Sequence, residues 1–546
     1  MSKTVNLAHY MFTRLRQLGV RSVHGVPGDY TLRALDYLKP AGLKWIGNCN
    51  ELNAGYAADG YARIKGISAL FTTYGVGELS ALNAVAESFA EFAPVDISLG
   101  DGSLGVYADI YMNFTVAQAS LFDPSTAAEV FDEALEKCMK ESRPIYVNLP
   151  SDMVGAQVLE SPLGRPLEIA PPTNEAGLES IVANLVLDRV YSSKRPYILE
   201  VNELARVTGF PTFASTFGGG TVDSTLHNYH GVHGGGHGSL DFAPYTNGAD
   251  LALLFRLFLS DTNTQGWSAV SERDITLAFR RKSIEFGASN VYQIHIRRFM
   301  RRLLDRLEPG RLPKQISAAS TLPSVRNQAA SLPPIDSSAS IDQDSFYLRI
   351  SSFFRPHDII VCANGTPLVG GRDFVLPPHA TLINSAIWLS VGHMFLATQG
   401  ISLAQSELGT GSRTIFFEGD GSFQATAQEL GTIDRYKLNA YIFIINNGGY
   451  TFERLIHGLD AEYNDVAPWR YLKAPEMMGA RNDGSYDFET HDVGTWGELQ
   501  SALGNESFQS GKGLKLVNVR MGRDDLTSNF KPALKLAGKQ LMAETS

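Results

Sequence analysis

The sequence predicts an α/β protein made of doubly wound parallel sheets. In residues 1–165, helical patterns alternate with short apolar runs such as Ala69–Phe71 and Pro144–Val147. This alternation is typical of βαβ units in a parallel sheet, and it resumes from residue 345 to the end of the chain. With 546 residues, 44% of them hydrophobic, the chain is long enough for about three domains.

Changes in composition divide the chain. We expect a first α/β domain over residues 1–165 and a second domain over residues 175–312, where Leu251–Phe255 resembles a strand. Residues 313–344 are rich in Ser, Ala and Pro and lose their apolar periodicity, which predicts a linker. A last α/β domain is expected over residues 345–546.

Composition also narrows the class of protein. The net charge of −10 and the lack of a basic tail argue against nucleic-acid binding. The three cysteines have no Cys-x-x-Cys spacing, which indicates a reducing compartment and no structural zinc. No signal-peptide core and no long apolar stretch is present, so we expect a cytoplasmic protein that does not enter a membrane.

Four histidines lie in or near the glycine-rich stretch 231–238. Four imidazoles can form a metal site, but no carboxylate or cysteine accompanies them here. We therefore favour a flexible surface loop and keep a metal site as the weaker alternative. The four are His227, His230, His233 and His237.

The most informative motif begins with an apolar strand, Thr414–Phe417. The following Gly419-Asp420-Gly421 predicts a turn too tight for side chains at the two glycines, with Asp420 projecting beyond the sheet edge. A helix predicted over Gln424–Tyr436 would point its N-terminal N–H groups at the same place. These N–H groups suit a diphosphate.

A second apolar strand, Ala440–Ile445, would bring Asn447 and the carbonyl of Gly449 to that edge, where open α/β sheets bind ligands. Together with Asp420, these oxygens suit Mg²⁺ bound to a diphosphate. The alternative is that both segments are only turns. Residues 100–103 repeat Gly-Asp-Gly-Ser but lack the second strand, so we assign them no function.

A second pattern lies in residues 48–63, where small residues recur three or four positions apart and predict a helix that packs closely against another. Glu51 falls in its first turn. Spacing alone favours a helix-end residue there over a functional carboxylate. The small residues are Ala54, Ala57, Ala58 and Ala62.

Four segments resemble thiamine diphosphate-dependent 2-oxo acid decarboxylases, above all the fungal pyruvate decarboxylases. They are His24–Asp29, Gly47–Arg63, Thr72–Ser80 and Gly419–His457. The resemblance runs through nearly the whole chain and implies pyrimidine-binding, middle and diphosphate-binding domains. It also implies homodimers, usually paired into homotetramers, with active sites between two chains.

The resemblance implies non-oxidative decarboxylation of a 2-oxo acid, most of all pyruvate, to an aldehyde and CO₂ through a thiamine ylide, with thiamine diphosphate and Mg²⁺ as cofactors. It replaces the helix-end interpretation of Glu51, because this glutamate matches the one that activates the aminopyrimidine ring. Asp29 and Glu453 match the two acids that handle protons.

Further residues carry over from the family one by one. Asp420, Asn447 and Gly449 match the metal ligands, and Gly421 and Ser422 lie at the diphosphate. Thr366 matches a cofactor contact. The carbonyl of Leu389 would receive the 4′-amino group, and Val391 matches the apolar residue that bends the cofactor.

The chain departs from the family in two places. After Val95 a segment is missing, and Asp96 and Ile97 stand where the family has tandem histidines; another segment is missing near Leu199. An aspartate would repel an anionic substrate, and isoleucine cannot donate a proton. The alternatives are therefore a non-catalytic thiamine diphosphate-binding paralogue or truncated gene product, and a thiamine-dependent carboligase.

Overall fold

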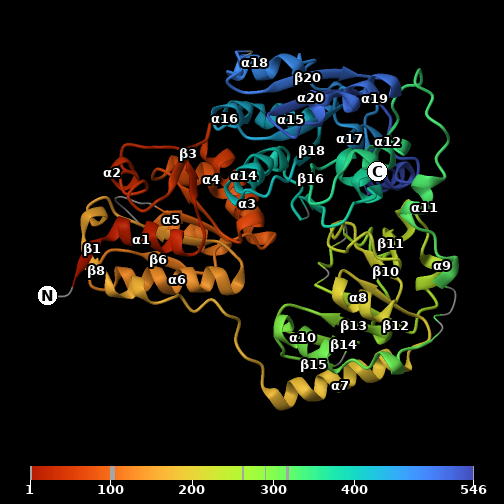
Figure 1. Cartoon of the computed structure of the whole chain (residues 1–546), viewed down its shortest axis with the longest axis horizontal. Coiled ribbons are helices and arrows are strands. Elements are labelled where there is room, and N and C mark those ends of the chain that lie inside the picture. The colour runs from red at the N-terminus through yellow and green to blue at the C-terminus, as the bar shows by residue number, and fades with distance from the viewer. Residues whose placement is uncertain are drawn as a thin grey trace.

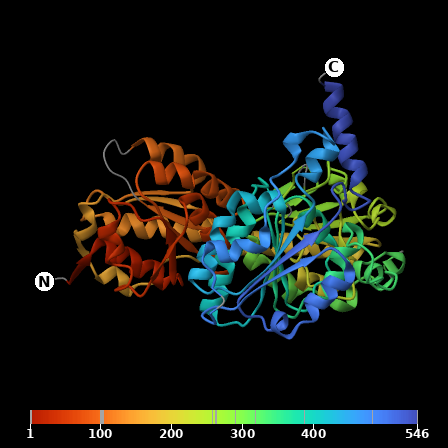
Figure 2. The same cartoon turned by 90° about the horizontal axis from the view of Figure 1, so that it is seen from above.

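The computed structural model describes residues 3–98, 105–256, 258–260, 263–288, 290–314, 316, 319–385, 387–481 and 483–544. Three large sheets form three lobes. In Figure 1 the N-terminal lobe lies at the left, with the middle lobe below the C-terminal lobe at the right. Figure 2 shows the N-terminal lobe beside the other two. The predicted α/β class is confirmed, and the exact domain boundaries stay predictions.

The N-terminal sheet has six parallel strands in the order β3-β2-β4-β5-β7-β6. Helices α1 and α6 cover one face, and α3 to α5 cover the other. A small antiparallel pair, β1 with β8, lies beside it. The elements are β1 (Thr4–Asn6), α1 (Leu7–Gln17), β2 (Ser22–Gly25), α2 (Leu32–Leu35), β3 (Lys44–Gly47), α3 (Glu51–Lys65), β4 (Ser68–Phe71), α4 (Val76–Ala90), β5 (Val95–Ser98), α5 (Gly105–Tyr111), β6 (Gln118–Ser120), α6 (Ala127–Glu141), β7 (Ile145–Asn148) and β8 (Gln157–Leu159).

Strand β5 lies at the first shortening. It pairs in parallel with β4 on one side and β7 on the other, so the sheet is continuous. Asp96 and Ile97 lie in this central strand. Residues 100–103, the second Gly-Asp-Gly-Ser, lie outside the described residues.

The middle sheet has seven strands in the order β11-β10-β9-β12-β13-β14-β15. Five are parallel, but β14 and β15 run antiparallel at one edge, because the short connection from β13 permits only a hairpin. Strand β9 reaches α8 through Glu200 and Val201 alone, at the second shortening. The elements are α7 (Ala176–Ser192), β9 (Pro196–Leu199), α8 (Asn202–Thr208), β10 (Thr212–Ala214), β11 (Tyr229–Val232), α9 (Ala243–Thr246), β12 (Leu251–Phe255), β13 (Thr276–Phe279), β14 (Ile284–Phe286), β15 (Asn290–Tyr292) and α10 (Ile296–Arg306).

The flexible-loop prediction for the histidine segment was wrong in part. Tyr229–Val232 forms the edge strand β11, and His233 is buried against the rings of Phe213 and Phe242. Within the described part of the chain, no group of three or more His, Cys, Asp or Glu side chains could hold a metal ion. The side chain of His237 is outside that description.

The C-terminal sheet has six parallel strands in the order β17-β16-β18-β19-β21-β20. It holds both strands of the predicted anchor, β18 and β19. The elements are α11 (Val325–Ala330), α12 (Gln343–Ile350), β16 (Ile359–Cys362), α13 (Thr366–Gly370), β17 (Thr381–Asn384), α14 (His393–Leu408), β18 (Thr414–Gly419), α15 (Asp420–Thr426), α16 (Leu430–Arg435), β19 (Ala440–Asn446), α17 (Thr451–Ile456), α18 (Ala474–Met478), β20 (Phe488–Val493), α19 (Trp496–Gly504), α20 (Glu506–Gln509), β21 (Leu514–Arg520) and α21 (Lys531–Glu544).

Helix α3 joins the N-terminal lobe to the C-terminal lobe by packing on α14, as its small residues predicted. The two backbones approach so closely that a Cβ atom on Gly60 would overlap the carbonyl oxygen of Ala397. A Cβ atom on Gly400 would likewise overlap the carbonyl oxygen of Ala57. Across the described ranges, no helix has the length and apolar character to span a bilayer.

Candidate active site

A cavity of about 750 Å³ lies between the middle and C-terminal lobes, within the usual size range of ligand sites. Most of the predicted cofactor residues line it. They are Thr366, Leu389, Val391, Asp420, Gly421, Ser422, Asn447, Gly449 and Glu453.

Asp420 is positioned where β18 ends and α15 begins, and its side chain is almost fully buried. One carboxylate oxygen accepts from the N–H of Gly421 at 2.8 Å. The other accepts from Gly448 and Gly449 at 2.7 and 3.1 Å. Burial raises the pKa of Asp420 to about 6, although these hydrogen bonds oppose the shift. A bound cation would favour the ionised carboxylate at this place.

Of the two glycines around Asp420, only Gly421 is required by close packing. Gly419 has φ −74°, which any residue can adopt, and neither glycine has a positive φ. A Cβ atom on Gly421 would lie 2.6 Å from the ring of Tyr450, whereas one on Gly419 would meet nothing within 4 Å. The predicted tight turn was therefore wrong, because the strand runs straight into the helix.

The turn after β19 is held by Arg454, which the sequence analysis did not single out. Its guanidinium donates to the carbonyl of Asn447 at 3.1 Å and of Gly448 at 2.5 Å. Gly449 has φ 140° and packs against the backbone of Asn464, so another residue would be strained there. Because Arg454 is buried and charged, it fixes this loop while leaving the Asn447 amide at the cavity.

Leu389 and Val391 come from the segment before α14. Leu389 has φ 54°, which is unusual for a branched residue. Its carbonyl accepts a hydrogen bond from Asn364, another residue that the sequence analysis missed. Val391 is half-exposed and lines the cavity, as suits an apolar residue that contacts a cofactor.

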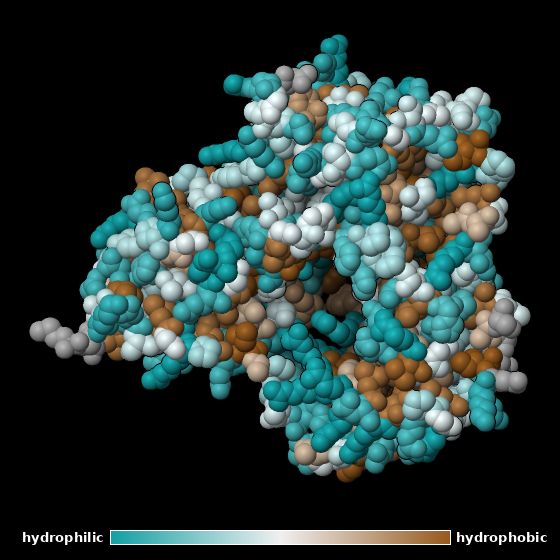
Figure 3. Space-filling model, viewed as in Figure 1, coloured by the Kyte–Doolittle hydropathy of each residue, from teal (hydrophilic) through white to brown (hydrophobic). Residues whose placement is uncertain are grey.

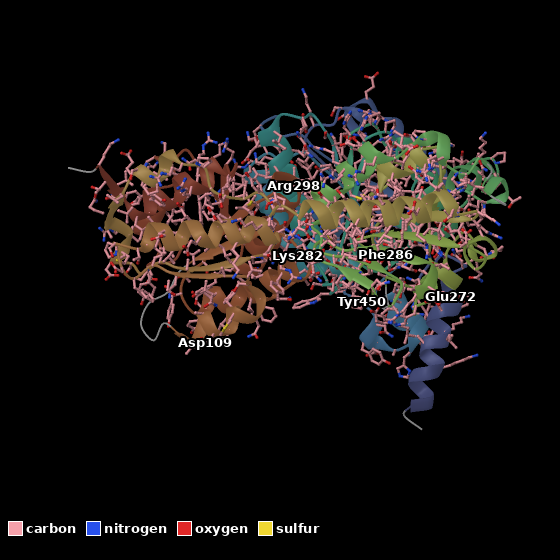
Figure 4. All side chains as sticks on the ribbon, turned by 90° about the horizontal axis from the view of Figure 1, so that it is seen from below. Asp109, Glu272, Lys282, Phe286, Arg298 and Tyr450 are labelled. Carbon is pink, nitrogen blue, oxygen red and sulfur yellow. The ribbon has the colours of Figure 1, made fainter. Side chains whose placement is uncertain are left out.

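Glu453 lies in the first turn of α17 and lines the same cavity beside Tyr450, which is labelled in Figure 4. Helix α21 forms part of the wall, and Phe530 just before it contacts the ring of Phe452. Phe217 and Gln265 of the middle lobe complete the wall. Nothing local in the sequence marks these walls, because they come from distant segments.

Asp29 and Glu51 do not line this cavity. They lie on the N-terminal lobe, after β2 and at the start of α3. Asn50 is the N-cap of α3, so Glu51 is not itself the cap. A Cβ atom on Gly77 would lie 2.8 Å from a carboxylate oxygen of Glu51. Within one chain, Asp29 and Glu51 therefore lie apart from the cavity that Glu453 lines.

A second cavity of about 770 Å³ lies where the three lobes meet, and Figure 3 shows the surface hollowed there. Arg256 and Arg280 of the middle lobe line it, together with Glu91 of the N-terminal lobe. No predicted site residue faces it.

The residues at the first cavity fit thiamine diphosphate with Mg²⁺. A buried carboxylate, an amide and backbone carbonyls are the oxygen ligands that Mg²⁺ prefers. Cβ atoms on Gly365, Gly419 and Gly448 would meet nothing within 4 Å, so the backbone is open to phosphate oxygens. Gly421 and Ser422, at the start of α15, line the same space.

Two family models match the chain. The N-terminal TPP binding domain of thiamine pyrophosphate enzymes matches residues 5–98, and the C-terminal TPP binding domain matches residues 370–502. The first match contains the half-site with Asp29 and Glu51. The second contains Asp420, Asn447 and Glu453.

Similarity to curated relatives extends over nearly the full length. The chain is 42% identical to a pyruvate decarboxylase of Aspergillus parasiticus, with 96% of each chain covered. It is 36% identical to one of Aspergillus fumigatus, with 99% of this chain and 98% of the relative covered. Pyruvate decarboxylase isozyme 2 of Saccharomyces cerevisiae is 32% identical, with 96% and 97% covered.

This chain belongs to the pyruvate decarboxylase family. The family resemblance is thereby confirmed, and the TPP binding domains support thiamine diphosphate as its cofactor. The alignment with the Aspergillus parasiticus protein spans 562 positions, more than the 546 residues of this chain. This family member therefore lacks residues that its relative has.

Proposed function

We propose that this protein converts a 2-oxo acid, above all pyruvate, into an aldehyde and CO₂ with thiamine diphosphate and Mg²⁺. The observation that carries this proposal is that Asp420, Asn447 and Glu453 converge on one cavity in a member of the pyruvate decarboxylase family. The three cysteines are free, which supports the proposed cytoplasmic location.

Each cofactor group has a proposed partner. Asp420, Asn447 and the Gly449 carbonyl hold Mg²⁺, while Gly421 and Ser422 hold the diphosphate. Thr366, the Leu389 carbonyl and Val391 hold the rings. When bound, thiamine diphosphate supplies a carbon nucleophile and an acceptor for the electrons released with CO₂.

The proton-handling residues come from both half-sites. Glu453 lies on the cavity wall and is placed to give or take a proton at the reacting carbon. Glu51 would hydrogen-bond the aminopyrimidine ring and so orient its proton-accepting nitrogen. Asp29, contributed by the other half-site, would be the second proton-handling acid beside Glu453.

The two half-sites meet between chains in this proposal. The edge of the N-terminal lobe that carries Asp29 and Glu51 exposes large apolar side chains, which mark an interaction surface. We assign this edge to contact with the cavity of a second chain in a homodimer or homotetramer. The exposed side chains are Tyr30, Leu32, Val76 and Leu79.

A non-catalytic, cofactor-binding protein is the second candidate. It is favoured by the replacement of the family's tandem histidines, which lie in a loop, by Asp96 and Ile97. In this chain the two residues belong to strand β5. Neither side chain can donate a proton to an anionic substrate at neutral pH. Without the histidines, any proton transfer during decarboxylation would depend on Asp29, Glu51 and Glu453 alone.

Incubation of the purified protein with pyruvate, thiamine diphosphate and Mg²⁺ tests the proposal by the appearance of acetaldehyde. We expect Glu453→Gln to reduce kcat by about 100-fold or more while cofactor binding is retained. Absence of aldehyde from every short 2-oxo acid, with the cofactor bound, would favour the non-catalytic candidate. A 2-hydroxy ketone formed with an added aldehyde acceptor would instead indicate a carboligase.

A further inference from the structure

Five ionisable side chains are buried together where α3, α4 and α14 meet. They lie beside residues 387–391, here called the cofactor-facing segment, which contains Leu389 and Val391. None of the five lines the cofactor cavity, and none belongs to the proposed catalytic set. They are Asp59, Arg63, Glu87, Glu91 and His393.

His393 is the first residue of α14, two positions after Val391. Its ring is fully buried and stacks on Tyr56, with ring centroids 4.6 Å apart. Nε2 lies 3.1 Å from a carboxylate oxygen of Asp59, and Nδ1 lies 3.7 Å from one of Glu87. The imidazole therefore bridges carboxylates from two helices of the N-terminal lobe.

The carboxylates of α4 in turn hold the cofactor-facing segment. Glu87 accepts a hydrogen bond from the hydroxyl of Ser390. Glu91 accepts one from the backbone N–H of Ile387 at 3.1 Å. Arg63 connects the group, since it lies 2.6 Å from Asp59 and 2.5 Å from Glu91.

The segment needs such anchors because its backbone is held in an unfavourable conformation. Leu389 has φ 54° and Gly392, just beyond the segment, has φ 87°. A non-glycine residue with positive φ persists only where its surroundings enforce it. The Ser390 and Ile387 contacts lie on either side of Leu389.

We propose that His393 is a positioning residue that orients Glu87, and through Ser390 holds the Leu389 carbonyl and Val391 toward the cofactor. The inference rests on the proposed function, which assigns those two groups to thiamine diphosphate. His393 does not line the cofactor cavity. Its effect passes through Glu87.

The arrangement makes the anchor depend on pH. Burial lowers the pKa of His393, but the hydrogen bond and charge of Asp59 and the charge of Glu87 outweigh it, so the net shift is upward. Burial raises the pKa of Glu87. The groups facing the imidazole are Tyr56, Asp59 and Arg63 from α3 and Glu87 and Glu91 from α4.

The sign follows from the raised pKa of His393. The stabilisation contributed by the His393 charge is fully present below about pH 6.5, the unfolded-state value, and is lost as pH rises through the folded-state pKa. When His393 loses its proton, Arg63 is the one cation that remains in the group beside the carboxylates of Asp59, Glu87 and Glu91. The cofactor-facing segment should therefore loosen at alkaline pH.

His393→Phe tests the proposal because it keeps the ring stack on Tyr56 and removes the charge. Trp388 lies in the segment, and its fluorescence is isolated by subtracting the spectrum of Trp388→Phe. In the full-length wild-type protein without added cofactor, we expect iodide quenching of Trp388 to increase from pH 6.5 to 9. In His393→Phe, quenching should be high and independent of pH.

Cofactor affinity and turnover give the second readout. We expect thiamine diphosphate to bind about tenfold more weakly to His393→Phe at pH 6.5, with kcat reduced to a similar extent, since a small misplacement of binding groups is costly. The effects of His393→Phe and Glu87→Gln should be non-additive in a double-mutant cycle. His24→Phe removes another buried imidazole, outside the group, and serves as the matched control.

The outcomes separate the two proposals. If His393→Phe lowers only the melting temperature, while Trp388 quenching, affinity and the pH profile match wild type, the positioning role is wrong. Additive effects of the two variants would also overturn it. If Trp388 quenching and thiamine diphosphate affinity change as expected but the wild type forms no aldehyde, the positioning role stands and the proposed decarboxylation fails.

Discussion

Two buried histidines in this chain have opposite electrostatics. His393 lies between carboxylates, which raise its pKa. His24, in β2, is also fully buried; among the described residues neither of its ring nitrogens has a well-formed hydrogen bond, and the nearby Asn48 side chain only partly compensates. Burial lowers the pKa of His24 to about 4. Histidine thus takes part in a group of ion pairs at position 393, whereas at position 24 its burial lowers the stability of the folded protein.

We predict that His24→Phe stabilises the protein. An unsatisfied buried polar group costs about 1–3 kcal/mol, and a phenyl ring can keep the edge contact with Tyr61. The lowered pKa of His24 means that the unfolded state binds its proton more readily between about pH 6.5 and 4. Stability therefore falls with decreasing pH in that window.

Urea unfolding at pH 7 and pH 5 measures this effect. The variant should unfold at higher urea concentration at both pH values, and the gain should be larger at pH 5. A variant less stable than wild type at both pH values would show that the cavity around His24 does not accept a phenyl ring. Equal gains at both pH values would contradict the lowered pKa.

The positions of individual cavity residues were predictable where the pattern is local. Asp420, Asn447 and Gly449 lie within two strand-to-helix connections, and the order of residue types alone indicated oxygen ligands. Why residue 421 must be a glycine was not predictable, because the ring that would contact a side chain there belongs to Tyr450, from another segment. Arg454 and Asn364 were missed because their roles are hydrogen bonds to backbone carbonyls, which no pattern of residue types reveals.

At the scale of elements, strands were predicted more accurately than helices. Strand β12 spans Leu251–Phe255 as expected, and β18 and β19 extend slightly beyond the predicted ends. The helix predicted over Gln424–Tyr436 instead begins at Asp420 and is interrupted by a 3₁₀ turn at Ala427–Glu429. Glu429 accepts from the N–H of Cys49 in the N-terminal lobe, a tertiary contact that local sequence does not reveal.

The packing of α3 on α14 leads to a prediction about Gly60. Gly60→Ala would place a methyl group against the carbonyl of Ala397 and force the two helices apart. Overpacking of this kind costs about 1–3 kcal/mol. Thermal unfolding should show a lower melting temperature for the variant.

Gly504→Ala is the matched control, because it also lies in a helix but a Cβ atom there would meet nothing within 4 Å. It should be neutral or stabilising by up to about 1 kcal/mol. A Gly60→Ala variant as stable as this control would contradict the close approach of α3 and α14.

For the whole molecule, the sequence predicted the two half-sites separately but not how the lobes complete them. Each half-site is a run of neighbouring residues, so its chemistry is visible in the sequence. The cavity walls from Phe217 and Leu536 and the pair of His393 with Asp59 join segments far apart in the chain. Only the folded arrangement brings them together.

The separation of Glu51 from Glu453 predicts complementation between inactive chains. If each active site takes Glu51 from one chain and Glu453 from the other, a heterodimer of Glu51→Gln and Glu453→Gln chains contains one site with both mutations and one intact site. Random pairing of the two variants, refolded or coexpressed together, should restore about a quarter of wild-type activity. Acetaldehyde formation from pyruvate measures the recovery. An equal mixture of the double variant Glu51→Gln/Glu453→Gln with wild type is the matched control: its heterodimers have one mutation in each shared site, so only the wild-type homodimers are active and about a quarter of wild-type activity, not a half, should remain. Activity that stays at the level of the separate variants, despite heterodimers in the mixture, would show that the sites are not shared between chains.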